Sequence, residues 1–324
     1  MSLNAQTGLV VQERAGNVIL FSIANPSHRT TIPVGAKPHE IELTPDGRTA
    51  FVSNFGLLEV NHKEGSAGTT ISVIDVVTRR ERTRYSLPSD FTAPHGLKLR
   101  PNQFRELFTN AEDGKEGMVV FNAASGAVLR TFPLPSGIHN FVFNSEGSAL
   151  FAFAVNGTVY RIDPDSGNVL AHVQLSSPRG LAWSADNGSL IASGKNEIVM
   201  LDPAHLSIVK RIGNLGVGQI FYPTATPDGH WILAPAVLDS VLLILDASTG
   251  AVARRIETGS PLLTVIGPRR TEAWVSNVLV PAGMFGPATK PRDGGVAHLD
   301  LNTFEVTPIP NLPDANGIAI SAQP

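Results

Sequence analysis

The chain has 324 residues, with 42% hydrophobic residues, 16% charged residues and a net charge of −3, a composition that can fill a packed core and excludes intrinsic disorder. It has no cysteine, which excludes disulfides, thiolate nucleophiles and thiolate metal sites. It has neither a basic block that could follow a phosphate backbone nor an apolar run near the ~20 residues of a membrane span, so we expect no nucleic-acid partner and no membrane span.

The first predicted elements are three alternating apolar segments near 8–13, 17–23 and 29–34. A phrase then follows in which an apolar strand leads into a Pro-Asp-Gly turn, from Pro38 to Gly47. Further segments with the strand period of two complete this unit. Its four predicted strands, A to D from channel to rim, lie near 39–44, 49–54, 69–75 and 81–87.

The same phrase recurs along the rest of the chain at intervals of about 40 to 56 residues. Its second residues are His39, His95, His139, Arg179, Phe221, Leu262 and Asn316. A repeat of roughly 40–45 residues is the length of a four-stranded propeller blade. The two longest intervals predict inserted loops within blades rather than a different fold.

The ends of the chain complement each other. The segment 8–34 supplies strands B, C and D of a first blade, and 315–321 supplies the missing strand A. Such pairing removes an open sheet edge. The sequence therefore predicts an all-β fold: a single domain, 1–324, that forms a seven-bladed β-propeller of four-stranded antiparallel blades, closed by the C-terminal strand.

Three segments carry a family resemblance: Phe51-Val52-Ser53-Asn54 after the Pro-Asp-Gly turn, and its echoes Leu107–Asn110 and Trp274–Asn277. They resemble the Tyr-Val-Thr-Asn (YVTN) repeat propellers, which are akin to the bacterial lactonase-like propellers. The resemblance covers essentially the whole chain. It implies the fold and leaves the function open, since such propellers include lactone hydrolases, streptogramin lyases, the haem-binding propeller of cytochrome cd-type nitrite reductase and surface proteins without known chemistry.

Three histidines are the sharpest chemical feature, because His39, His95 and His139 stand at matched positions on three consecutive blades. Neutral imidazoles that converge from separate strands can bind a divalent metal ion and leave a position open for water. Loops could add Glu112, Asp113 or His62 to this set. A structural role is the alternative, because alternation places His39 on the face of Ile41 and Leu43, beside the interblade packing.

Other candidates lie on the same predicted face. Glu40, Arg179 and Asn316 are candidate catalytic groups, the last two as residues that orient the substrate. The two inserted loops, 55–68 in blade 2 and 278–295 in blade 7, should rise side by side there, because both blades flank blade 1. The residues expected to contact substrate are Asn54, Asn110, Asn277, His62, Phe221, Met284 and Phe285.

Two further expectations concern polar residues of the inner strands. The asparagines that end strand B, Asn54, Asn110 and Asn277, either hold loop backbone or orient a ligand. Glu42 and Lys98 occupy matched positions on adjacent blades, so we expect them to pair across the channel.

Three hypotheses for function follow. The first is a lactonase- or lyase-type enzyme with a divalent metal ion on the three histidines. The second is a non-catalytic propeller whose loops bind a protein or a small ligand, with an exposed apolar patch at Leu57, Leu58, Met284 and Phe285. The third is a tetrapyrrole-binding propeller. We expect a monomer; the polar stretch Met1–Thr7 carries no signal-peptide pattern, so a cytoplasmic location is expected, or an exported one if a leader has been removed.

Overall fold

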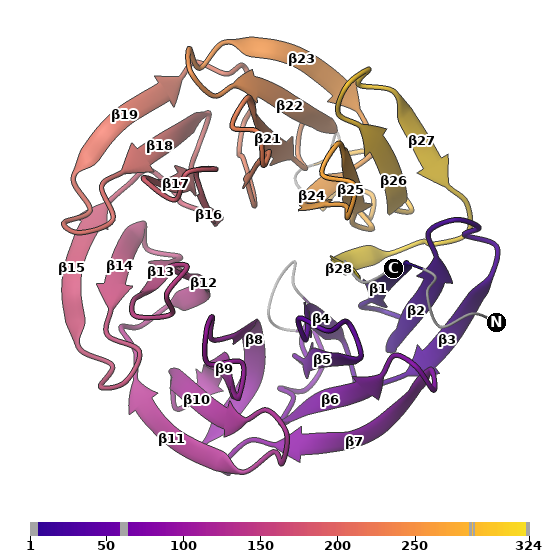
Figure 1. Cartoon of the computed structure of the whole chain (residues 1–324), viewed down its shortest axis with the longest axis vertical. Helices are drawn as coiled ribbons and strands as arrows, with labels where there is room; N and C mark the ends of the chain where they lie inside the picture. Colours follow the sequence, from indigo (N-terminus) through magenta and orange to yellow (C-terminus); the bar gives the residue numbers. More distant parts are fainter. Residues whose placement is uncertain (1–5, 59–63, 285–286, 288, 322–324) are drawn as a thin grey trace.

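The computed structural model describes residues 6–58, 64–284, 287 and 289–321. Its strands form seven four-stranded antiparallel sheets arranged in a ring (Figure 1). The predicted all-β, seven-bladed propeller is therefore confirmed. Within the described ranges, no helical segment has the length and hydropathy of a membrane span.

In every blade the first strand faces the centre of the ring and the fourth forms the rim. Blade 1 consists of β28 (Ala315–Ile320), β1 (Thr7–Gln12), β2 (Asn17–Ser22) and β3 (Arg29–Pro33). Blade 2 consists of β4 (Pro38–Leu43), β5 (Thr49–Asn54), β6 (Thr70–Asp75) and β7 (Arg80–Ser86). Blade 3 consists of β8 (Phe91–Leu99), β9 (Glu106–Gly114), β10 (Gly117–Asn122) and β11 (Val128–Pro133). Blade 4 consists of β12 (Ile138–Phe143), β13 (Leu150–Ala154), β14 (Thr158–Ile162) and β15 (Val169–Gln174). Blade 5 consists of β16 (Leu181–Trp183), β17 (Leu190–Ser193), β18 (Glu197–Leu201) and β19 (Ile208–Gly213). Blade 6 consists of β20 (Thr224–Ala225), β21 (Trp231–Ala236), β22 (Val241–Asp246) and β23 (Val252–Glu257). Blade 7 consists of β24 (Pro261–Ile266), β25 (Glu272–Asn277), β26 (Gly295–Asp300) and β27 (Val306–Ile309).

The ring closes through blade 1, as the sequence predicts. β28 pairs antiparallel with β1, with Leu9 opposite Ala319 and Val10 opposite Ile318. The last strand of the chain thus becomes the innermost strand of the first blade, and the sheet edge that β1 would otherwise expose is covered.

The hydrophobic core is divided among the interfaces between blades. One cluster of buried apolar side chains lies at each of the seven interfaces, including the interface between blades 7 and 1. At that interface Val10, Phe21 and Ile318 pack against Trp274, and the rings of Phe21 and Trp274 are 5.7 Å apart. The closing strand is therefore held by packing as well as by ladder hydrogen bonds.

The insertion of blade 2 joins β5 to β6 and begins as a narrow hairpin. Leu57 and Gly65 form an isolated antiparallel bridge. Phe55 and Leu58 are buried, with exposed fractions of 0% and 1%. The exposed apolar patch expected for a binding propeller is thus wrong at Leu58, because this side chain is buried near the start of the insertion.

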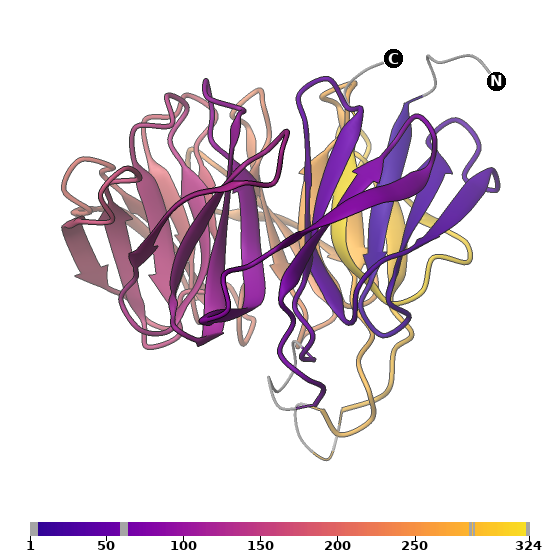
Figure 2. The ribbon, with the colours of Figure 1, turned by 90° about the horizontal axis from the view of Figure 1, so that it is seen from below.

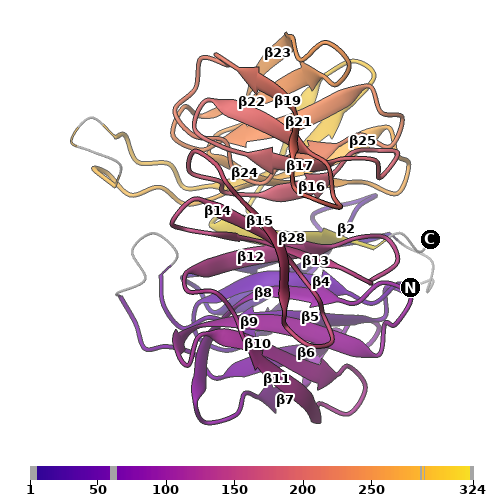
Figure 3. The ribbon, with the colours of Figure 1, turned by 90° about the vertical axis from the view of Figure 1, so that its left-hand side faces the viewer.

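The insertion of blade 7 joins β25 to β26, with a bridge between Val280 and Arg292. Met284 packs with Val280 and Phe221 in a small apolar cluster on the blade 6 side. Both insertions project from the same face of the ring, as Figures 2 and 3 show, in agreement with the prediction. Phe285 lies outside the described residues.

Ring closure yields a first testable prediction. Replacing Ile318, which is 3% exposed, by alanine opens a cavity at the closing interface and should lower the free energy of unfolding by about 2–5 kcal/mol. Val209→Ala on the rim, where the side chain is 62% exposed, should change it by no more than about 0.5 kcal/mol. Urea unfolding measures both; equal effects of the two substitutions would refute the account of closure.

Candidate functional site

A β-bulge recurs near the start of the innermost strand in five blades. In blade 2 the register with β5 shifts between Pro38 and Ile41, so that β4 holds one extra residue there. The same shift occurs in blades 1, 3, 4 and 7. Bulges re-aim side chains at the rims of barrels and beside active sites. In blades 2 to 4 the bulge contains the predicted histidine.

The three histidines come together in a stack at the inner edge of the ring. The ring centroids of His39 and His95 are 4.2 Å apart, and those of His95 and His139 are 4.1 Å apart. Phe55 contacts the first two imidazoles and Phe153 the third. All three histidines are buried, with exposed fractions of 0–6%, so the residues at the matched positions of the repeat do converge.

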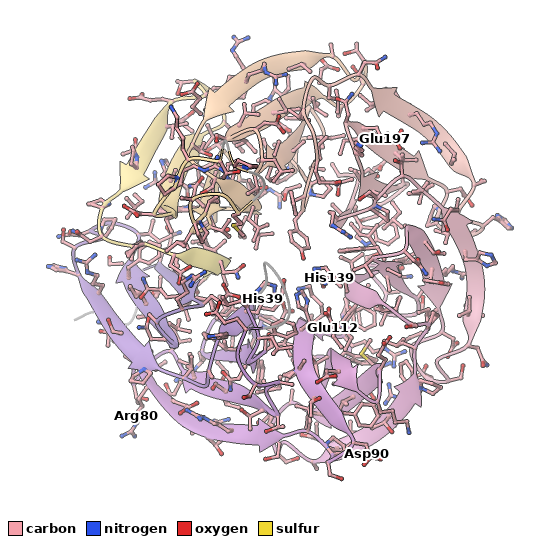
Figure 4. The ribbon with its side chains drawn as sticks, turned by 180° about the vertical axis from the view of Figure 1, so that it is seen from behind. His39, Arg80, Asp90, Glu112, His139 and Glu197 are labelled. Atoms are coloured by element: carbon pink, nitrogen blue, oxygen red, sulfur yellow. The ribbon has the colours of Figure 1, made fainter. Side chains whose placement is uncertain are left out.

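Glu112 joins two of these imidazoles. Its Oε1 atom lies 3.0 Å from His139 Nδ1 and 3.6 Å from His95 Nδ1, and Figure 4 shows Glu112 beside His139. One donor atom from each of the three residues lies within 4.8 Å of the other two. Donors about 2.1 Å from one ion at tetrahedral angles are roughly 3.4 Å apart, close to the two separations from Glu112 Oε1, so the three residues are near enough together that they could hold a metal ion.

Glu112 reaches the histidines because the hairpin of β8 and β9 is longer than its counterparts. Both strands have nine residues and stay paired as far as Phe91 and Gly114, where Gly114 adopts φ +67° before the turn into β10. Glu112 stands two residues after Asn110 and therefore on the same face of the strand. From the sequence, Glu112 is only one of several groups that loops could add to the histidines; the alternation from Asn110 is the signal that places it on their side of the strand.

His39 has a different partner. Asn316, from the closing strand β28, donates from Nδ2 to His39 Nδ1 at 2.8 Å, and both residues are buried. The tautomer of His39 is therefore fixed with its hydrogen on Nε2. The predicted set of three histidine ligands thus divides into His95 and His139 with Glu112, and His39 with Asn316.

Glu40, the residue after His39, connects blade 2 to blades 3 and 4. Its Oε2 accepts from Lys98 Nζ at 3.1 Å and its Oε1 accepts from Asn140 Nδ2 at 3.0 Å. Glu42 instead accepts from the backbone N–H of Leu99 at 3.1 Å. The predicted pairing of Lys98 with Glu42 is therefore wrong as a direct contact, because the bulge in β4 turns Glu40 toward the amine.

These groups shift one another's pKa. Burial alone would raise the pKa of Glu40, but the charge of Lys98, assisted by His39 and His95, holds it below its ordinary value. Burial would lower the pKa of Lys98, but Glu40 and Glu42 hold it above its ordinary value. For Glu42, burial prevails over the attraction of Lys98 and the pKa is raised.

Asn110 holds the loop that carries His139. Its Oδ1 accepts from Gly96 N at 2.9 Å, and its Nδ2 donates to the carbonyls of Ile138 and His139 at 3.1 and 3.2 Å. The residue is completely buried. Asn110 therefore links blade 3 to blade 4 and fixes the backbone of two histidine-bearing strands.

Asn54 holds a backbone and a side-chain group, and Asn277 holds a side-chain group. Asn54 is buried, accepts from Gly35 N at 3.0 Å and donates to Ser72 Oγ at 2.9 Å. Asn277 is buried and accepts from Thr258 Oγ1 at 3.2 Å. Both side chains support the loops around the channel mouth.

Arg179 and Phe221 come from blades 5 and 6, across the ring from the histidines. Arg179 is half-buried and makes a 3.4 Å contact with the carbonyl of Pro178. Phe221 packs near Met284 under the blade 7 insertion. His62 lies outside the described residues.

The innermost strands line a partly open cavity of about 390 Å³. Blades 2 to 4 line it with the charged and polar groups Glu40, Glu42, Lys98 and Asn140. The facing blades line it with mainly apolar side chains, among them Leu181, Tyr222, Leu263, Val265 and Ile318. A cavity of this size and mixed lining is typical of a site for a small molecule.

No family model matches the chain, and no curated protein matches it significantly in sequence. Solved structures do match, and three of them share 13% identity with this chain over 98% of its length. They include a functionally unknown protein from Desulfotomaculum acetoxidans (TM-score 0.75, 99% of its length), a protein from Bacteroides fragilis named provisionally as a 6-phosphogluconolactonase (TM-score 0.72, 98%), and the dihydro-heme d1 dehydrogenase NirN in complex with DHE (TM-score 0.68, 75%). At this identity the similarities establish a shared fold.

The ion pair of Glu40 and Lys98 yields a second prediction. Glu40→Gln should lower the free energy of unfolding by about 1–3 kcal/mol at pH 7, because the partly buried ammonium loses its carboxylate partner. Since the folded-state pKa of Glu40 lies below 4.5, the stabilisation is present above about pH 4.5 and is lost as the pH falls through that lower value. Urea unfolding at pH 7 and pH 3 should show the difference shrink, whereas Glu257→Gln on the exposed rim should have no effect at either pH. A penalty that is independent of pH would contradict the ion pair.

Proposed function

We propose that the channel mouth is a metal-dependent site for the hydrolysis or elimination of a small substrate, in the manner of lactonase-like propellers. His95, His139 and Glu112 would hold a divalent ion. The observation that carries the proposal is the position of Glu112 Oε1, at 3.0 and 3.6 Å from the two imidazole nitrogens. Two imidazoles and one carboxylate are a recurrent donor set of catalytic metal sites that keep an open position.

The bound ion would polarise a carbonyl oxygen or lower the pKa of a bound water. Glu40 stays ionised at neutral pH, because its pKa is held below the ordinary value, so it supports the site electrostatically rather than as a proton donor. Arg179 is half-buried at the mouth, and its guanidinium can orient a carboxylate or carbonyl oxygen of the substrate. Asn316 acts through His39, whose ring it fixes.

Lactone hydrolysis is the reaction of choice for a first screen. The sequence resembles YVTN-repeat propellers, which are akin to lactonases, and a protein named provisionally as a 6-phosphogluconolactonase has the same fold. Both observations support the class of reaction, and the donor set supports the use of a metal ion.

Tetrapyrrole binding is the second candidate, and the fold shared with NirN in complex with DHE supports it. The histidine stack weighs against ligation of one iron by neighbouring histidines, because rings 4.1 and 4.2 Å apart leave no space for a macrocycle between them. A Soret band in the purified protein would favour this candidate over the hydrolase.

Metal content tests the donor set. Protein purified without added metal and then exposed to Zn²⁺ or Mn²⁺ should retain about one ion per chain after dialysis. His95→Ala, His139→Ala and Glu112→Gln should each lower the metal affinity by more than about tenfold, since even loss of an outer-shell partner costs 10–100-fold. The matched control is His205→Ala, because His205 lies on the exposed surface. Folded variants that retain the full metal content would overturn the proposed ligands.

Activity tests the chemistry separately. Proton release from a panel of five- and six-membered lactones should be abolished by a chelator and restored by added metal. Glu112→Gln should reduce kcat/KM by at least about a hundredfold, whereas His205→Ala should leave it unchanged. Turnover that survives both the chelator and Glu112→Gln would contradict a metal-dependent mechanism.

A further inference from the structure

The cavity inside the ring has two chemically different walls. Its charged side chains all come from blades 2 and 3: Glu40, Glu42 and Lys98. The wall opposite is built from aliphatic and aromatic side chains of blades 4 to 7 and of the closing strand, including Val265 and Ile318. A ligand that fills this space must therefore be polar at one end and apolar at the other.

The charges on the polar wall do not balance. Lys98 and Glu40 form an ion pair at 3.1 Å and largely neutralise each other. Glu42 contributes a second carboxylate, and its Oε1 accepts from the backbone N–H of Leu99. Among the residues that the structure describes, no donor lies within hydrogen-bonding distance of its Oε2.

A ligand that displaces water from the cavity removes the water that would otherwise hydrate the Glu42 carboxylate. An anionic or purely apolar ligand would leave the charge of Glu42 desolvated, which is strongly unfavourable. A ligand with a cationic N–H group restores the lost hydrogen bond as a charge-assisted one, the strongest kind available to a carboxylate. Burial raises the pKa of Glu42 above its ordinary value, and a cation beside Oε2 opposes that shift and favours the ionised form, so the polar wall selects a cation.

We propose that the cavity inside the ring binds a small organic cation, with its ammonium group on Glu42 and its hydrocarbon or aromatic body against Val265 and Ile318. The volume of about 390 Å³ is within the range of small-molecule pockets, roughly 300–1,000 Å³. Phe153 and Tyr222, which also line the cavity, add flat surfaces for an aromatic body. This site is separate from the proposed metal ligands and does not depend on them.

Calorimetric titration with three probes of one shape tests the proposal. 2-Phenylethylamine is a cation at pH 7, since alkyl amines titrate near ~10; 2-phenylethanol is neutral and 3-phenylpropanoate is an anion. The amine should bind at least about tenfold more tightly than the alcohol, and the anion should not bind measurably. Equal affinity for the amine and the alcohol, tighter binding of the anion, or no binding of the amine at millimolar concentration would overturn the proposal.

Variants locate the binding. Glu42→Gln should lower the affinity for the amine by at least about tenfold and leave that for the alcohol unchanged, whereas Glu257→Gln on the exposed rim should alter neither. Val265→Phe narrows the apolar wall without touching a charge, so it should weaken both ligands and remains informative if Glu42→Gln folds poorly. Amine binding that is unaffected by both Glu42→Gln and Val265→Phe would place the ligand elsewhere and refute the site.

His95→Ala distinguishes this proposal from the metal site. The variant should lose metal and still bind the amine with unchanged affinity, because no proposed contact of the ammonium involves His95. Loss of amine binding in a folded His95→Ala variant would overturn the claim that the cavity is a separate site. Loss of metal with amine binding intact would support both proposals, and metal retained with amine binding intact would remove only the metal site.

Discussion

The antiparallel pairing of β28 with β1 is the interaction on which the rest of the molecule depends. It brings residues from opposite ends of the chain into one sheet and seats blade 1 between blades 7 and 2. The apolar cluster between blades 7 and 1 completes the set of interblade cores. Closure also fixes where the two insertions lie, because they belong to the two blades that flank blade 1. It further places Asn316 of the closing strand beside His39.

The repeat places a histidine at the same position in three blades, and differences between the blades determine what each histidine contacts. The same bulge and the same histidine recur in blades 2, 3 and 4. His39 meets Asn316 of the closing strand, whereas His95 and His139 meet Glu112 of a lengthened hairpin. Three equivalent positions thus have two different kinds of partner, and these partners are residues outside the repeated pattern.

The blades and their composite closure could be predicted from the sequence because they follow from the repeat and from strand alternation, and the convergence of the histidines because they hold matched positions in that repeat. Two features could not. Lys98 contacts Glu40 rather than Glu42, because a bulge disturbs the alternation that the prediction assumed. The position of Glu112 beside the histidines depends on how far the hairpin of β8 and β9 extends, and hairpin length is a property of pairing between strands that alternation within one strand does not fix.

The juxtaposition of His95, His139 and Glu112 is the central claim, and X-ray absorption at the zinc edge of protein loaded with one equivalent of Zn²⁺ tests it most directly. The account predicts two imidazole nitrogens at about 2.0–2.1 Å and oxygen ligands at about 2.0–2.2 Å. It also predicts that one imidazole disappears from the spectrum of His95→Ala. An all-oxygen shell, or a spectrum that His95→Ala leaves unchanged, would contradict the claim.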